Sequence, residues 1–109
     1  MKTAKILRRL EDYTGVAYLC HLDPPLAREA WSEEDQPPSY EHVVVSATVA
    51  SYSGPETYIF GADEAGEVAA WGELPGSYRG GLDHEEALRG AGYDHIVWEQ
   101  EAKRKLEES

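Results

Sequence analysis

The chain is poor in cysteine, in basic residues and in long apolar runs, and each shortage excludes a class of protein. Its 109 residues include a single cysteine, Cys20, so no intramolecular disulfide framework can form. No uninterrupted apolar stretch approaches the roughly 20 residues of a membrane-spanning helix. The basic start, residues 1–10, is not followed by the apolar core of a secretory signal. We therefore expect a soluble intracellular protein in a reducing compartment.

Basic residues are too few to balance the acidic ones. The chain has 10 Lys and Arg against 21 Asp and Glu, which gives a formal net charge of −11 at pH 7. Residues 11–100 contain eighteen carboxylates and three arginines, which gives this part of the chain a formal net charge of −15. Such a charge repels the nucleic-acid backbone and favours basic or neutral partner surfaces. Solubility alone is a simpler explanation of the same charge.

The sequence also lacks the residue spacings that metal, nucleotide or nucleophilic sites need. Its histidines form no i,i+4 pair and it has no cysteine pair, so the usual zinc spacings are absent. Cys20 and His21 are neighbours in an expected strand, where neighbouring side chains point to opposite faces. The glycines before Asp83 follow no phosphate-loop order, and this aspartate puts negative charge where an anion would bind. We expect no metal, no cofactor and no catalytic residue.

Alternating apolar residues predict two strands near the start of the chain. They cover Ala4 to Leu10 and Val16 to Leu22, which a turn-rich segment connects, and we interpret them as a β-hairpin. The sequence Asp23-Pro24-Pro25 then predicts that the strand stops and that Asp23 caps one helical turn, with Pro24 at its first position. Residues 32–39, SEEDQPPS, are acidic and contain prolines, which predicts a mobile loop.

Three further strands are expected in the middle of the chain. Tyr40 to Tyr52 is rich in β-branched residues and apolar on both faces, which indicates a central strand. Turn residues lead from it into Glu56 to Phe60 and then into Glu67 to Trp71, so these segments form a three-stranded meander. Tyr93 to Trp98 would add a last strand.

A short helix with most of its boundary signals begins after Leu82. Asp83 is a good N-cap, and Glu86 stands three residues later, where its side chain can reach back and complete a capping box. Leu82 is placed for a hydrophobic staple across this end. Gly90 or Gly92 supplies the left-handed position after the helix. Acidic residues in a first turn stabilise the helix dipole, so we interpret them as capping groups rather than as acid–base catalysts.

Together these elements predict an α+β fold. We expect an antiparallel sheet of about five to six strands, made of an N-terminal hairpin and a three-stranded meander, with one short capped helix and a C-terminal helix. Residues 1–98 would form a single domain. Residues 99–109 carry Glu–Lys pairs at i,i+4 spacing and are expected to form a charged helical extension.

Aromatic residues with polar tips dominate: seven Tyr and three Trp stand against one Phe. Such side chains suit half-buried positions and protein interfaces. The candidate interaction cluster is Trp71, Tyr78 and Arg79, around the glycine-rich segment before the helix. The alternative is that Trp71 and Tyr78 cover the end of the sheet and pack on the helix.

Several segments give the sequence a family resemblance. They are KILRRL and CHLDPPL near the start, SGPETYIF and WGEL in the middle, and the block GSYRGGLDHEEAL with its later AGY. Over residues 1 to about 95 the chain resembles small uncharacterised accessory proteins of actinobacteriophages, especially mycobacteriophages. The resemblance brings no catalytic motif with it, and residues 99–109 extend beyond its pattern.

The resemblance and the composition lead to three functional hypotheses. The first is a non-catalytic bacteriophage protein that acts in the cytoplasm of the infected host by binding a host protein, without contacting nucleic acid or membrane directly. The second is an acidic DNA mimic that inhibits a host DNA-binding protein or nuclease, which needs carboxylates spaced like DNA phosphates. The third is a small hydrolase, which needs a pocket where His84 or His95 meets a carboxylate. A homo-oligomer is compatible with the sequence but not implied by it.

Overall fold

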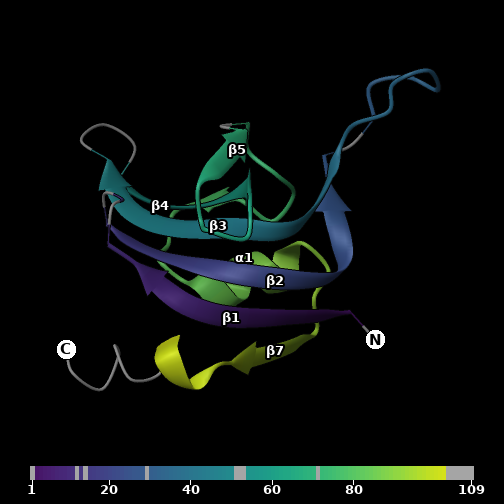
Figure 1. Cartoon of the computed structure of the whole chain (residues 1–109). Helices are drawn as coiled ribbons and strands as arrows, with labels where there is room; N and C mark the ends of the chain where they lie inside the picture. Colours follow the sequence, from purple (N-terminus) through teal and green to yellow (C-terminus); the bar gives the residue numbers. More distant parts are fainter. Residues whose placement is uncertain are drawn as a thin grey trace.

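The computed structural model describes residues 2–11, 13, 15–28, 30–50, 54–70 and 72–102. Over these residues one mixed, largely antiparallel sheet has the strand order β5-β4-β3-β2-β1-β7, and β6 pairs with β4 beside this path (Figure 1). The elements are β1 (Thr3–Leu10), β2 (Val16–Ala27), β3 (Ser39–Ala50), β4 (Gly54–Ala62), β5 (Val68–Ala70), β6 (Tyr78–Arg79), α1 (His84–Gly90) and β7 (His95–Trp98). The predicted α+β class is confirmed.

The expected hairpin and meander are one continuous up-and-down array, because β2 also pairs antiparallel with β3. The central position predicted for β3 is confirmed. The predicted antiparallel pairing holds for the other strands but not for β7, which runs parallel to β1 from Thr3↔His95 to Ile6↔Trp98. The cause is topological. After β6 the chain crosses one face of the sheet through α1, and it reaches the β1 edge in the direction of β1.

The prediction that β2 stops at its prolines is also wrong. The strand continues to Ala27, and Leu26 pairs with Tyr40. The pairing with β3 shifts between His21 and Leu26, and both prolines lie exposed inside this irregular stretch. A residue without an N–H is tolerated where the ladder is interrupted, so no helical turn is needed to accommodate Pro24.

Two segments around the helix differ in detail from expectation. The glycine-rich segment expected as a loop contains β6, in which Arg79 pairs with Glu56 and Tyr78 with Thr57. Residues 100–102 are helical, as expected after Trp98, and Ala102 is fully buried. The rest of the predicted C-terminal extension, residues 103–109, lies outside the described residues.

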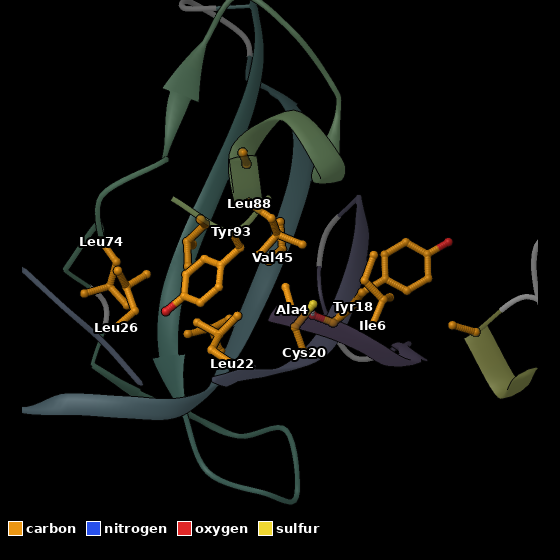
Figure 2. Packing of buried hydrophobic residues seen from close by; sticks show 14 residues of the cluster. Ala4, Ile6, Tyr18, Cys20, Leu22, Leu26, Val45, Leu74, Leu88 and Tyr93 are labelled. Atoms are coloured by element: carbon orange, nitrogen blue, oxygen red, sulfur yellow. Dashed lines mark hydrogen bonds between the residues drawn. The ribbon is translucent and has the colours of Figure 1, made fainter. Parts of the chain in front are cut away.

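Helix α1 covers one face of the sheet, which we call the inner face. Its core takes alternate residues of the strands, such as Val43 and Val45, both fully buried. Leu88 of α1 and Tyr93 after it pack on the strands, as Figure 2 shows. Each strand thus contributes every second side chain to this core, as the period of two requires.

The opposite face, which we call the outer face, holds a smaller cluster. Its buried members are Leu10, Ala17, Leu19, Val44 and Ala62. The turn between β4 and β5 folds over this face, in front of β3 in Figure 1. The sheet is therefore covered on both faces, but on the outer face only in part.

Candidate binding site on the outer face of the sheet

The uncovered part of the outer face contains an open hollow of about 870 Å³. Its floor is Ser46 and Thr48 of β3, and one wall is Tyr58 and Phe60 of β4. Ser46 lies directly opposite Tyr58 in the β3–β4 ladder. Short hydroxyl side chains beside large rings leave space that no side chain fills, so the hollow follows from the register of the two strands.

Glu56 and Arg79 form a hydrogen-bonded group with Tyr58 of the aromatic wall. Tyr58 and Phe60 have ring centroids 5.8 Å apart with planes 32° apart. The Tyr58 hydroxyl donates to Glu56 Oε2 at 2.5 Å, and Arg79 Nε lies 3.3 Å from Glu56 Oε1. Glu56 is only 5% exposed, and these two donors satisfy its buried carboxylate. The hydrogen bond to Glu56 raises the pKa of Tyr58, so the phenol keeps its proton at neutral pH.

The wall opposite Tyr58 and Phe60 consists of residues 8–11 and 13 together with residues 65–67 of the turn between β4 and β5. Arg8 Nη2 donates to the Ala65 carbonyl at 2.6 Å, and the Tyr13 hydroxyl donates to the Gly66 carbonyl at 2.8 Å. Gly66 has φ +92°, and a Cβ there would lie 2.9 Å from Leu10 Cδ2, so the turn requires glycine for both reasons. These bonds connect β1 and the turn after it to the turn between β4 and β5.

The hollow is chemically mixed. Arg8 and Arg9 are the cations of the lining, Glu11 and Glu67 are its carboxylates, and the Ser46 and Thr48 hydroxyls lie on the floor. Aromatic faces combined with a guanidinium and hydroxyl groups are typical of surfaces that hold a polar or aromatic partner group. The arrangement suits reversible binding.

The structure separates the predicted interaction residues. Trp71 lies outside the described residues. Tyr78 and Arg79 are neighbours in β6 and lie toward opposite faces. Tyr78 packs against the inner core, whereas the Arg79 side chain, 63% exposed, pairs with Glu56 and Glu73 near the aromatic wall. Arg79 approaches the Tyr58 ring, with Cζ 5.9 Å from its centroid, but neither Tyr78 nor Arg79 lines the hollow, and the binding role of all three residues stays a prediction.

The predicted capping residues lie at the start of α1. Asp83 is the N-cap, and its carboxylate accepts from the Glu86 N–H at 3.1 Å. The Asp83 N–H donates to Thr57 Oγ1 at 3.3 Å rather than to the Glu86 side chain. Leu82 is 51% exposed. Gly92, with φ +106°, takes the left-handed position after the helix.

The residues considered for catalysis or metal binding do not come together. Cys20 is fully buried, and burial raises the pKa of its thiol. His84 Nε2 lies 2.8 Å from the Val16 carbonyl, and burial lowers the pKa of this imidazole. His95 is exposed on β7. Within the described ranges no ion pair joins either histidine to a carboxylate, and no group of three His, Cys, Asp or Glu could hold a metal ion.

The site residues predicted from the sequence do not include Arg8, Tyr13, Tyr58 and Phe60. The available signal was the alternation of β4, which puts Tyr58 and Phe60 on one face together with Glu56. The bonds of Arg8 and Tyr13 to the distant turn have no counterpart in the local pattern.

Comparison of the chain with protein-family models, with curated proteins and with solved structures gave no match. None of the helices in the described part of the chain is long and apolar enough to cross a bilayer.

Proposed function

We propose that this protein is a non-catalytic binding protein that acts by holding a partner protein, with the hollow on its outer face as the contact surface. The observation that carries the proposal is the open, aromatic-walled hollow, in which Tyr58 is hydrogen-bonded to Glu56 and contacts the Phe60 ring without any partner present. Preorganised Tyr, Phe and Arg side chains lose little conformational entropy on binding, and they are common at interface cores.

The charge of the chain supports a basic or neutral partner. The net charge of −11 repels nucleic acid and anionic membranes, and it attracts lysine- and arginine-rich surfaces over a Debye length. The resemblance to actinobacteriophage accessory proteins adds the setting: the partner is a protein of the infected bacterial cytoplasm.

The test is quantitative affinity capture from mycobacterial lysate. Phe60→Thr removes half of the aromatic wall and keeps a β-branched residue in β4, and Glu86→Gln on the opposite face is the matched control. We expect one host protein to be enriched by the wild type and by the control, and recovered at least tenfold less by Phe60→Thr. Equal recovery by a folded Phe60→Thr protein would refute the hollow as the contact surface.

The DNA-mimic hypothesis predicts a different result in the same assay. Duplex DNA added to the lysate would then displace the captured protein, because both compete for one basic site. Under our proposal, duplex DNA leaves the capture unchanged.

A further inference from the structure

The connection between β2 and β3 extends away from the rest of the molecule, as Figure 1 shows. We call residues 28 and 30–38 the Trp31 loop. Trp31 is 83% exposed, more than any other large hydrophobic side chain among the described residues. A large apolar side chain exposed to this degree contributes little to the fold by burial, and the contacts that hold it are therefore what distinguishes it.

The Trp31 loop is closed on itself by one ion pair. Arg28 binds Asp35 through two bonds, Nη1 to Oδ2 at 2.7 Å and Nη2 to Oδ1 at 3.1 Å. Asp35 Oδ2 also accepts from the Trp31 backbone N–H at 2.8 Å, and the Asp35 N–H donates to the Ser32 carbonyl at 3.2 Å. The hydrogen bond from Arg28 holds the pKa of Asp35 below its ordinary value, so the pair is charged at physiological pH.

The same guanidinium holds the indole. Arg28 Cζ lies 4.0 Å from the Trp31 ring centroid, which is cation–π geometry. The planar carboxylate fixes the guanidinium at its edge and the indole stacks on its face, a combination that Lys could not make. Trp31 is therefore held by its backbone and by its ring while most of its surface stays in water.

Trp and Arg are both enriched among the residues that carry most of the binding energy of protein interfaces. Because Asp35 already binds the Trp31 N–H and Arg28 already contacts its ring, Trp31 would lose less conformational freedom on entering a pocket than an unheld side chain would. The charged residues around the indole indicate what kind of pocket on a partner would receive it. Glu33 and Glu34 are exposed next to Trp31, whereas the charge of Asp35 is balanced by Arg28.

We propose that Trp31 is an anchor that inserts into an apolar pocket bordered by Lys or Arg side chains on the partner protein. The acidic flank of the loop requires a basic rim, and the net charge of −11 opposes insertion into a second copy of this chain. The proposal rests on protein binding as the function, but it does not depend on the hollow of the outer face.

The first experiment identifies what the anchor contacts. A photo-reactive benzoylphenylalanine replaces the exposed Ser32 in the full-length protein, and mycobacterial lysate is irradiated with it. We expect cross-links to one host protein, at a site where apolar residues are flanked by lysine or arginine. Cross-links only to a second copy of the chain, or no cross-links at all, would overturn the proposal.

The second experiment measures affinity for the purified cross-linked protein. Trp31→Ala is expected to weaken binding at least 30-fold, as hot-spot removal does, while Val49→Thr changes it less than twofold. Val49 is the matched control because it is an apolar residue on β3, 67% exposed. Asp35→Asn is expected to weaken binding about tenfold, because it loosens the loop and leaves the indole in place. Replacing Glu33 and Glu34 by Gln is expected to slow association several-fold and to flatten its salt dependence.

The pattern over the variants separates this proposal from the proposed function. If Trp31→Ala binds like the wild type, the anchor is wrong, whatever Phe60→Thr does. If Trp31→Ala abolishes capture while Phe60→Thr retains it, the anchor is supported and the hollow is not the contact surface. Loss in both variants supports both surfaces on one partner.

Discussion

The two faces of the sheet come from the same strands and differ in how completely they are filled. On β4, Ile59 is fully buried in the inner core, and the next residue, Phe60, is half-buried at the hollow. On β3, Val45 closes the inner face while Ser46 forms the floor on the outer one. Apolar side chains and a helix close the inner face (Figure 2), whereas small residues leave space on the other. The inner face is thus a closed core, whereas the outer face combines a small core with an open hollow.

The largest expected effect is on stability, and it comes from truncating the neighbouring residues Ile59 and Phe60 of β4. Ile59→Ala should lower the free energy of unfolding by about 2–5 kcal/mol, because it leaves a cavity in a closed core. Phe60→Ala should cost about 1 kcal/mol, because its ring is half in water already. Urea unfolding followed by far-UV circular dichroism measures both. Equal losses would mean that the outer face is as tightly packed as the inner one.

Filling the hollow should affect binding and leave the fold intact. Ser46→Val adds a β-branched side chain to the floor and should reduce partner recovery about tenfold, while stability changes by less than about 1 kcal/mol. The affinity capture described above, together with a urea midpoint, gives both numbers. Ala47→Val, which introduces the same side chain on the inner side of the strand, is the control. If Ser46→Val binds normally, the hollow does not hold the partner.

Removing the helix cap should weaken the cover of the inner face alone. Asp83→Ala removes the acceptor of the Glu86 N–H and should cost about 1 kcal/mol of stability. Glu86→Ala should cost no more than a few tenths, since the Asp83 N–H donates to Thr57. Thermal melts of the two variants compare them directly. A larger loss in Glu86→Ala would show that a capping box forms in solution.

The smallest effect is a pH dependence that arises on the inner face. His84 contacts the Val16 carbonyl and the Tyr18 ring, with Asp83 and Arg9 nearby, and burial lowers its pKa from 6.5. The unfolded chain therefore binds this proton first, so stability is full above pH 6.5 and decreases as the pH falls through the folded-state pKa. Urea midpoints at pH 7.5 and 5.5 should differ less in His84→Gln than in the wild type. An unchanged difference would assign the pH dependence to other groups.

Local pattern was sufficient for the elements whose signals lie within a few residues. The β-branched run of β3 predicted its central place, and the residues around Asp83 predicted the start of α1. The sequence pattern did not predict pairing between residues that are distant in sequence. The parallel pairing of β7 depends on where the chain returns after α1, and the continuation of β2 depends on Tyr40 lying opposite Leu26.

The hollow and the Trp31 loop could not be predicted from the sequence for the same reason. The hollow exists because Ser46 meets Tyr58 across a ladder, and neither residue alone signals it. The Trp31 loop is closed by an ion pair between Arg28 and Asp35. Only Asp35 lies in residues 32–39, whose predicted mobility stays a prediction, and local pattern does not indicate the contact with Arg28.

The parallel pair of β1 and β7 has a consequence for synthesis. Thr3 finds its partner His95 only after almost the whole described chain has left the ribosome. Until then β1 has β2 on one side and an open edge on the other, and contacts this distant in sequence form slowly. The nascent chain therefore passes through a stage in which its first strand can pair with another molecule, and the arrival of residues 95–98 ends that stage.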